Sequence, residues 1–422
     1  MDWVEHAIWW QVYPLGFCGA PIRDPEPTPA PRLRRLTGWL DYAIELGTSG
    51  LLLGPVFASQ THGYDTVDPM RVDPRLGTNE DLLALIDAAH TRGVRVMLDG
   101  VFNHVGIDHP DFAALPRVGP RSRQAGMFRL TWPGGEDAWR PGTAPDYERF
   151  EGQDWLPELD HSCEAVVELV TDVMTHWCSR GVDGWRLDAA YAIDPTFWTR
   201  VLPRVRRAHP EVYIVGEVIH GDYAAIVSAS GMDAVTQYEL WQAIWHSLAE
   251  ANFYELDWTL GRNAELLRTF VPWTFIGNHD VTRIASAVGP DGAVTALAVL
   301  MTVGGIPSIY SGDEQGFTGV KEERAGGDDA VRPAFPASPD GLAPWGWGVY
   351  RAHQDLIGLR RRNPWLTTAT TSAVALENQR YTYRVRAADS SACLDVSIDL
   401  TSTPRATIRD GGGTVLWEQA GH

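Results

Sequence analysis

Three acidic residues, Asp188, Glu217 and Asp280, stand at or just beyond the ends of short apolar runs. Retaining hydrolysis of a glycosidic bond uses two carboxyl groups about 5–5.5 Å apart, because a nucleophile and a protonated acid must act while positive charge develops on the sugar. Groups that are distant in sequence can meet if each ends a strand of one parallel barrel. The three acids therefore predict a glycosidase site.

The same segments supply possible partners for these acids. Arg186 lies two residues before Asp188 and on the same face of a strand, so its guanidinium can keep that carboxylate ionised through charge-assisted hydrogen bonds. Tyr64, His104 and His279 are further candidates. An isolated histidine or tyrosine most often has a packing or surface role. The assignment of these three to a site therefore depends on the segments that contain them.

Short apolar runs alternate with longer helical patterns along the chain, which indicates a parallel sheet covered by helices. The predicted strands are residues 7–13, 50–54, 94–99, 184–188, 212–217, 234–237, 274–277 and 306–310. The predicted helices include residues 33–46, 79–91, 164–179, 196–208 and 293–302. Eight such units predict an α/β fold, a (β/α)8 TIM barrel. In that fold the three acids, at the ends of the fourth, fifth and seventh strands, converge on one mouth.

Two stretches interrupt this alternation. Residues 105–160 are rich in Gly, Pro and Arg and are too long for an ordinary loop. Near the end, the alternation of apolar and polar residues is typical of half-buried strands. We predict a barrel over residues 1–104 and 161–370, a domain B inserted after strand three over 105–160, and a small, sandwich-like C-terminal β domain over 371–422.

Composition narrows the classes of ligand. The 422 residues carry a formal charge of −19, which argues against binding to nucleic acid or to an anionic membrane surface. A neutral, polar small molecule is the expected partner, and the sequence leaves the oligomeric state open. The apolar stretch 293–303 is too short to span a bilayer, and the first residues are acidic where an export signal is basic. These features predict a cytoplasmic protein.

Four segments, LDGVFNH (98–104), GWRLDAAY (184–191), IVGEVIH (214–220) and FIGNHD (275–280), occur in this order. They resemble the conserved segments of the α-amylase family, glycoside hydrolase family 13. LPELD (156–160) is similar to the family's fifth segment, and HGYDTVD (62–68) to its substrate-stacking loop. The likeness extends from about residue 8 to residue 364. Within the family, these motifs look most like those of intracellular maltodextrin and cyclodextrin hydrolases.

The resemblance implies a role for each candidate. Asp188 matches the nucleophile and Glu217 the general acid/base, whose protonated form is favoured by an anionic neighbour. Asp280 matches the acid that binds sugar hydroxyls and stabilises the transition state. The matches to substrate-binding positions are Tyr64, His104, Arg186 and His279. The matches to mainly structural positions are Asp99 and Asn103.

Other residues are candidates for lining the cleft or for holding a metal. Most of the eighteen tryptophans should fill core and interface space. The candidates for lining the cleft lie in or near loops at the presumed mouth and are Trp132, Trp139, Trp241, Tyr238 and Glu239. Many α-amylases hold Ca²⁺ with a histidine shortly after the nucleophile, but residues 189–192 contain none. We therefore expect no metal and no other cofactor.

The predicted activity is that of a retaining α-glucoside hydrolase acting on maltooligosaccharides or cyclic maltodextrins. Ala189, directly after the nucleophile position, favours α-1,4 bonds, because small residues accompany that preference in related enzymes. Val331 stands where exo-acting relatives often carry an arginine, which argues against recognition of a chain end by that route. The alternatives are an α-glucan transglycosylase using the same residues, an α-1,6-active oligosaccharide hydrolase and a non-catalytic relative.

Overall fold

The computed structural model describes residues 3–23, 28–324 and 326–421. Its centre is a parallel sheet of eight strands in the order β10-β9-β8-β5-β2-β1-β12-β11. A parallel bridge between Thr236 and Trp273 joins the two outer strands and closes the sheet into a barrel. The strands are β1 (Trp9–Val12), β2 (Gly50–Leu53), β5 (Arg95–Gly100), β8 (Gly184–Leu187), β9 (Tyr213–Gly216), β10 (Ala234–Val235), β11 (Trp273–Phe275) and β12 (Ile306–Tyr310). The predicted TIM barrel is confirmed.

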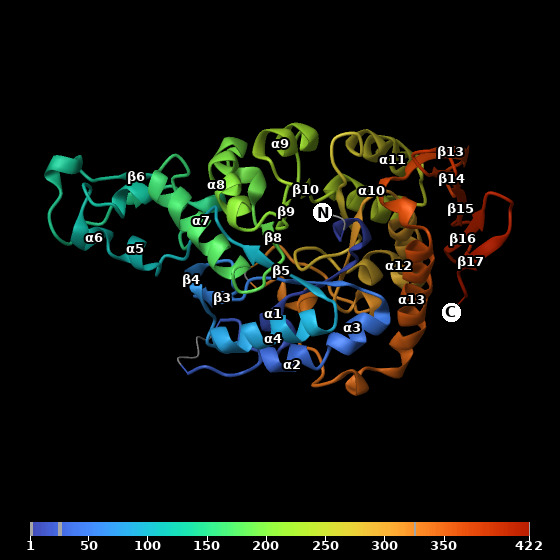
Figure 1. Ribbon diagram of the computed structural model, residues 1–422, viewed down its shortest axis with the longest axis horizontal. Helices are drawn as coiled ribbons and strands as arrows, with labels where there is room; N and C mark the ends of the chain where they lie inside the picture. Colours follow the sequence, from blue (N-terminus) through green and yellow to red (C-terminus); the bar gives the residue numbers. More distant parts are fainter. Residues whose placement is uncertain (1–2, 24–27, 325, 422) are drawn as a thin grey trace.

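The helices of the barrel surround this sheet (Figure 1). They are α1 (Pro14–Phe17), α2 (Leu33–Thr37), α3 (Leu40–Leu46), α4 (Asn79–Thr91), α7 (Glu164–Cys178), α8 (Pro195–Ala208), α9 (Tyr223–Ser230), α10 (Tyr238–Ala249), α11 (Tyr254–Leu266), α12 (Ile284–Thr302) and α13 (Trp347–Arg362). A strand covered on one side by helices and on the other by the barrel interior must be apolar on both faces. This explains why sequences such as GLLL in β2 contain no polar alternation.

Two predicted helices have different bounds in the structure. The helix expected over 33–46 is divided into α2 and α3 around Gly38. The helix expected to begin at residue 293 begins at Ile284 and is kinked at Gly289, whose φ is 74°. Among the described residues, α12 is the only helix long and apolar enough to cross a membrane, and 67% of its apolar window is buried within the protein. Its apolar surface packs against α10 and α13.

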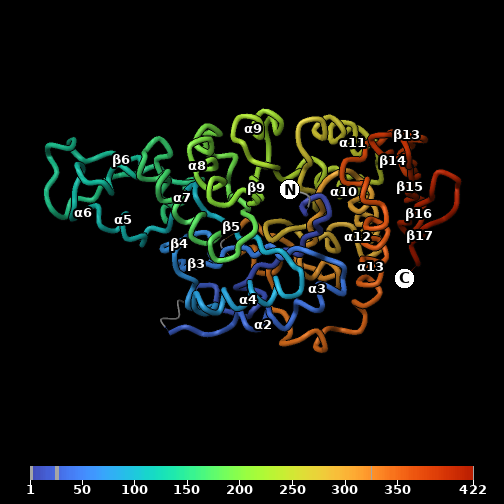
Figure 2. The backbone as a smooth tube through the Cα atoms, in the orientation of Figure 1, coloured from blue at the N-terminus to red at the C-terminus, as the bar shows by residue number. Residues whose placement is uncertain are grey.

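The segment between β5 and α7 forms a lobe that projects at one end of the long axis (Figure 2). It contains α5 (Pro110–Ala113), α6 (Leu115–Val118), β6 (Leu130–Thr131) and β7 (Asp146–Tyr147). Bridges between His104 and Glu158 and between Phe128 and Leu159 hold the end of the lobe against its beginning. The lobe corresponds to the predicted domain B, whose bounds stay a prediction.

The chain ends in one antiparallel sheet of five strands at the opposite end of the molecule (Figure 1). The strands are β13 (Thr370–Leu376), β14 (Arg380–Arg386), β15 (Cys393–Asp399), β16 (Arg405–Asp410) and β17 (Val415–Glu418). The C-terminal β domain is confirmed, but its expected sandwich form is wrong for the described residues. The barrel helices α11, α12 and α13 contact the sheet where a second sheet was expected. Tyr383, for example, is fully buried and its hydroxyl meets that of Thr302 on α12 at 2.8 Å.

Candidate active site

Asp188 follows β8 directly and lies at the mouth of the barrel. Its backbone N–H donates to the carbonyl of Gly100 at 3.0 Å, which continues the ladder between β8 and β5. Its side chain is buried and accepts a hydrogen bond from Nη1 of Arg186 at 3.0 Å. Because side chains two residues apart on a strand share a face, the predicted contact between Arg186 and Asp188 is present.

One guanidinium group connects acids from three neighbouring strands. Nη1 of Arg186 donates to both carboxylate oxygens of Asp99 at 2.8 Å, and Nη2 lies 2.5 Å from Oε1 of Glu217. Burial raises the pKa of Asp188 well above its usual value, Arg186 opposes this shift, and Glu217 and Asp99 reinforce it. Three buried carboxyl groups therefore share one cation, and burial outweighs the effect that Arg186 was expected to have on the ionisation of Asp188.

Glu217 follows β9 and is held on both of its carboxylate oxygens. Oε1 accepts from the hydroxyl of Tyr238 at 3.1 Å, and that hydroxyl accepts from Nδ2 of Asn278 at 2.9 Å. Oε2 accepts from the backbone N–H of Ala189 at 3.0 Å. Tyr238 thus lies at the site, as proposed, whereas its neighbour Glu239 forms an ion pair with Arg262 on α11.

Asp280 lies beyond the end of β11 and contacts two basic side chains. Its Oδ1 lies 2.5 Å from Nη2 of Arg332, and its Oδ2 lies 2.9 Å from Nε2 of His279. Burial acts to raise the pKa of Asp280, but His279 and Arg332 outweigh it and hold the pKa well below its usual value. Asp280 is therefore an anion across the neutral pH range.

Val331 does not line the catalytic cavity, whereas the next residue, Arg332, does. Val331 is fully buried, and its carbonyl accepts hydrogen bonds from Arg283 and Tyr310 at 2.9 Å each. A single helical turn at Asp329–Val331 directs Val331 into the core and the following residue, Arg332, into the cleft. Whether the protein recognises a chain end is therefore not decided by Val331, which stays a prediction from the sequence.

The remaining candidates form one connected group with these acids. Tyr64 lies between β3 (Phe57–Ser59) and β4 (Thr66–Val72), and its hydroxyl contacts Asp99 at 3.1 Å and also Nε2 of His279. His104 donates from Nε2 to the carbonyl of Tyr64 at 3.0 Å, and its ring stacks on Phe150 with centroids 4.4 Å apart. Burial lowers the pKa of His104 to about 4, so its ring is neutral and has a single N–H, which the carbonyl of Tyr64 accepts.

These side chains surround a cavity of about 380 Å³, lined by Asp188, Glu217, Asp280, Tyr64 and His104 among others. Arg186 and His279 are buried beneath it and contact its walls. The structure therefore brings together all seven predicted residues. None of the three tryptophan candidates lines this cavity, because Trp132 and Trp139 pack against each other within the lobe and Trp241 lies on α10.

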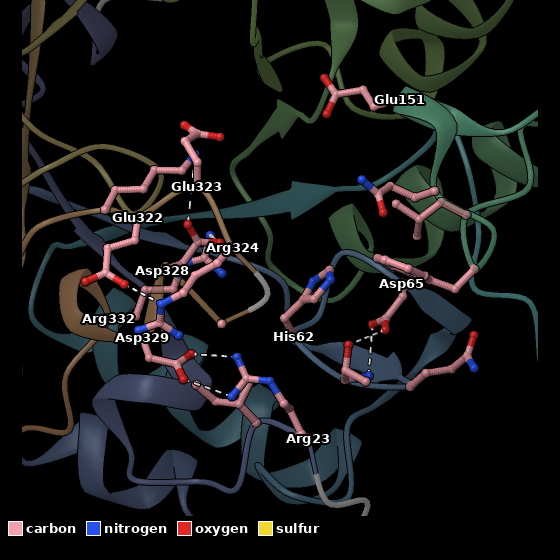
Figure 3. A pocket seen from close by; sticks show the side chains of 18 residues that line it. Arg23, His62, Asp65, Glu151, Glu322, Glu323, Arg324, Asp328, Asp329 and Arg332 are labelled. Carbon is pink, nitrogen blue, oxygen red and sulfur yellow. Dashed lines mark hydrogen bonds and ion pairs between the residues drawn. The ribbon is translucent and has the colours of Figure 1, made fainter.

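A second cavity of about 710 Å³ adjoins the first (Figure 3), and the two share His62, Glu151, Leu156, Lys321, Asp328 and Arg332. We call it the charged cavity, because charged residues form most of its wall. Arg23 and Asp329, which form a bidentate ion pair at 2.8 and 2.9 Å, lie at its base. Its polar wall suits a ligand with many hydroxyl groups.

A model of the α-amylase catalytic domain matches residues 11–343. The chain belongs to the α-amylase family. It is 30% identical over 402 residues to a cyclomaltodextrinase of Geobacillus thermopakistaniensis, covering 90% of this chain and 66% of that protein. It is also 30% identical over 407 residues to neopullulanase 2 of Thermoactinomyces vulgaris, covering 90% and 67%. The chain thus spans about two thirds of the length of these curated relatives.

Solved structures give the same assignment. The cyclic α-maltosyl-(1→6)-maltose hydrolase of Arthrobacter globiformis, in complex with maltose, has a TM-score of 0.80 and 26% identity, covering 94% of this chain and 92% of that chain. A debranching enzyme of Nostoc punctiforme has a TM-score of 0.79 and 27% identity, covering 96% and 90%. The predicted membership of the α-amylase family is confirmed.

Ala189 has a backbone conformation that restricts its side chain. Its φ is 46° and ψ is 35°, in the left-handed region, and this conformation points its N–H at Glu217. A β-branched residue is strained there, so Ala189→Val should lower the free energy of unfolding by about 1–2 kcal/mol and reduce kcat. Urea unfolding and initial rates would measure both. Ala189→Gly, which adopts this conformation freely, should keep the activity, and equal stability of the two variants would contradict the argument.

Arg332 should control the ionisation of Asp280. Arg332→Met removes a cation that favours the charged carboxylate, so the pKa of Asp280 should rise and the acid limb of the kcat/KM profile should move to higher pH. The lost charged hydrogen bond should lower kcat/KM about tenfold to a hundredfold. Arg332→Lys keeps the charge and should leave the acid limb near its original pH. An unchanged limb in Arg332→Met would show that the arginine has no such role.

Proposed function

We propose that this protein is a retaining α-glucoside hydrolase that cleaves α-1,4 bonds of maltooligosaccharides or cyclic maltodextrins. The observation that carries the proposal is the contact of Asp188 and Glu217 with the two terminal nitrogens of one buried guanidinium, that of Arg186. Two carboxyl groups that both contact one guanidinium suit a double displacement better than attack by a water molecule placed between two distant acids.

In the first step, Asp188 attacks the anomeric carbon while Glu217 gives its proton to the leaving glycosidic oxygen, so that one C–O bond forms as another breaks. In the second step, Glu217 takes a proton from water, and the water oxygen replaces Asp188 at the same carbon. Asp280, fixed by Arg332 and His279, is positioned to bind hydroxyls of the reacting ring. His104 and Phe150, whose rings stack on each other, also line the cavity.

The names of similar proteins support the proposed substrate class and an intracellular location. The matched proteins include cyclomaltodextrinases and an intracellular maltogenic amylase of Bacillus subtilis. A structural neighbour binds maltose. We therefore propose that this protein is an intracellular enzyme that acts on small oligosaccharides.

A second candidate is hydrolysis of α-1,6 bonds. It is favoured by the similarity to a hydrolase of cyclic α-maltosyl-(1→6)-maltose and to a debranching enzyme. Reducing-sugar release from maltotriose, α-cyclodextrin, pullulan and isomaltose separates the two candidates. Activity on maltotriose and α-cyclodextrin supports the first, activity confined to pullulan or isomaltose supports the second, and activity on none overturns both.

The protein is proposed to act without calcium. Asn103 makes its side-chain contact with His104, and the positions after the nucleophile supply Ala189 and Tyr191. No group of three or more His, Cys, Asp or Glu side chains in the described ranges is arranged to hold a metal. We predict that extensive dialysis against a chelator leaves kcat unchanged within about twofold and leaves the unfolding midpoint in place. Loss of turnover that Ca²⁺ alone restores would contradict this.

A further inference from the structure

Arg283 is a buried arginine that lies three residues after Asp280 and lines neither the catalytic cavity nor the charged cavity. Its backbone N–H donates to the carbonyl of Gly319 at 3.0 Å. Its guanidinium lies over the ring of Tyr310 on β12, 4.2 Å from the ring centroid. A buried cation is costly unless its N–H groups have partners. The partners of Arg283 therefore indicate which parts of the fold it holds in place.

The guanidinium of Arg283 connects the end of β12 with the loop that follows it. Nη1 donates to the carbonyl of Ser311 and to Oδ1 of Asp313, both at 2.8 Å. Nη2 donates to the carbonyl of Val331 at 2.9 Å, and the hydroxyl of Tyr310 donates to the same carbonyl at 2.9 Å. Two buried donors thus fix one carbonyl of the loop.

The fixed carbonyl belongs to the residue directly before Arg332. Because the peptide unit is planar, the position of the Val331 carbonyl also determines where the main chain of Arg332 begins. The side chain of Arg332 donates from Nε to the carbonyl of His279 at 2.8 Å, and its Nη2 contacts Oδ1 of Asp280. A series of contacts therefore leads from Arg283 to Asp280, although the two side chains do not meet.

The contact between Arg332 and Asp280 depends on accurate placement of the loop. Charge-assisted hydrogen bonds are short and weaken as their distance and angle depart from the optimum. Nη2 of Arg332 also lies 3.1 Å from Oδ2 of Asp328, so a second acid competes for the same nitrogen. A loop without its anchor would let this nitrogen shift from Asp280 toward Asp328. A displacement of about 1 Å at a reacting site can cost on the order of 100-fold in rate.

We propose that Arg283 is a positioning residue for the reaction, because it holds Val331 and thereby holds Arg332 against Asp280. Arg283 itself touches neither the cavity nor any of the three proposed catalytic acids. The inference rests on the proposed role of Asp280 in binding hydroxyls of the reacting sugar ring. It predicts that substitutions at Arg283 and at Arg332 damage the same step.

The test is a double-mutant cycle in kcat/KM, measured on the substrate that the wild type cleaves fastest in the panel above. Arg283→Met alone should lower kcat/KM about tenfold or more. In the Arg332→Met background the same substitution should change kcat/KM by less than about threefold, because the contact that it supports is already absent. Arg283→Lys keeps the charge and a donor, so it should recover part of the loss.

The pH profile supplies a second readout. Arg283→Met should move the acid limb of kcat/KM to higher pH, as Arg332→Met does, because Asp280 loses the same cation. Besides His279 and Arg332, the groups that interact electrostatically with Asp280 are Arg186, Asp188, His62, Tyr64, Tyr238 and Tyr310. Within the described ranges only Tyr310 among these contacts Arg283, so the shift should come from displacement of Arg332.

Arg360 is the matched control. It is also a buried arginine, and it donates to the carbonyls of Met301, Val303 and Gly305 at the end of β12 opposite the barrel mouth. It lines neither the catalytic cavity nor the charged cavity. Arg360→Met should therefore lower the free energy of unfolding, as Arg283→Met does, but leave kcat/KM and the acid limb of the folded protein unchanged.

Two results would overturn the inference. One is an equal loss from Arg283→Met in the wild-type and Arg332→Met backgrounds, and the other is a shift of the acid limb in Arg360→Met as large as that in Arg283→Met. If Arg283→Met does not fold, Tyr310→Phe, which removes the other donor to Val331, takes its place in the cycle and decides by the same comparison. A wild type that cleaves no substrate of the panel would instead reject the proposed function, and the inference with it.

Discussion

Replacing Asp188 with asparagine is expected to lower kcat on maltotriose by about 10⁴-fold or more, because loss of a nucleophile removes the covalent step entirely. The fold should persist. The amide oxygen of asparagine can still accept from Arg186, and the variant removes one of three buried carboxyl groups that share a single cation. Initial rates of reducing-sugar release and a thermal unfolding curve would measure both effects.

The matched control for this prediction lies at the other end of the same strand. Asp183 precedes β8, is bonded to Arg95 and His90, and lies far along the strand from the mouth. Asp183→Asn makes the same chemical change without touching the cavity, so kcat should stay near the wild-type value. If the two variants had similar activity, Asp188 would not be the nucleophile.

Glu217→Gln is expected to reduce kcat on maltotriose about 10²- to 10⁴-fold, the usual contribution of a positioned proton donor. With α-maltosyl fluoride, the rate of the first step should fall much less, because fluoride departs without protonation.

The substitution also disturbs the hydrogen bonds around the side chain. Both oxygens of Glu217 accept hydrogen bonds, so the amide nitrogen of glutamine would face a donor, either Ala189 N–H or Arg186 and Tyr238.

Glu239→Gln is the control for this second prediction. Glu239 lies 22 positions further along and is paired with Arg262 outside the catalytic cavity, so its replacement should leave both substrates unaffected. An equal loss on maltotriose and on the fluoride in Glu217→Gln would assign Glu217 a role other than proton donor.

Much of the barrel could be predicted because its strands are buried on both faces and therefore appear as short apolar runs. Six of the eight predicted runs contain the observed strand, and β5 and β11 each extend one residue beyond the predicted run. The fold of the C-terminal region could be predicted only in part. Tyr381, Tyr383 and Val385 alternate with polar residues, which predicts one buried face but does not reveal what covers it. Helices cover it here, so the expected second sheet is absent from the described residues.

The acids of the site were predictable because each follows a strand, and strand ends of a barrel meet. Arg332 was not predictable in this way. It lies 52 residues after Asp280, in a loop whose path depends on the anchoring of Val331 by Arg283 and Tyr310. Nor did the sequence indicate that Asp99, expected to be mainly structural, shares Arg186 with Asp188 and Glu217.

The barrel closes between β10 and β11, where the isolated bridge between Thr236 and Trp273 takes the place of a strand ladder. The hydrogen bond from Asn278, which follows β11, to Tyr238, which follows β10, connects the same two segments. The hydroxyl that orients Glu217 therefore also helps to hold β10 and β11 together. Heating that separates β10 from β11 would misalign the proton donor while the other strand pairs of the barrel are still intact. Enzyme activity would therefore be lost at a lower temperature than the temperature at which the protein unfolds.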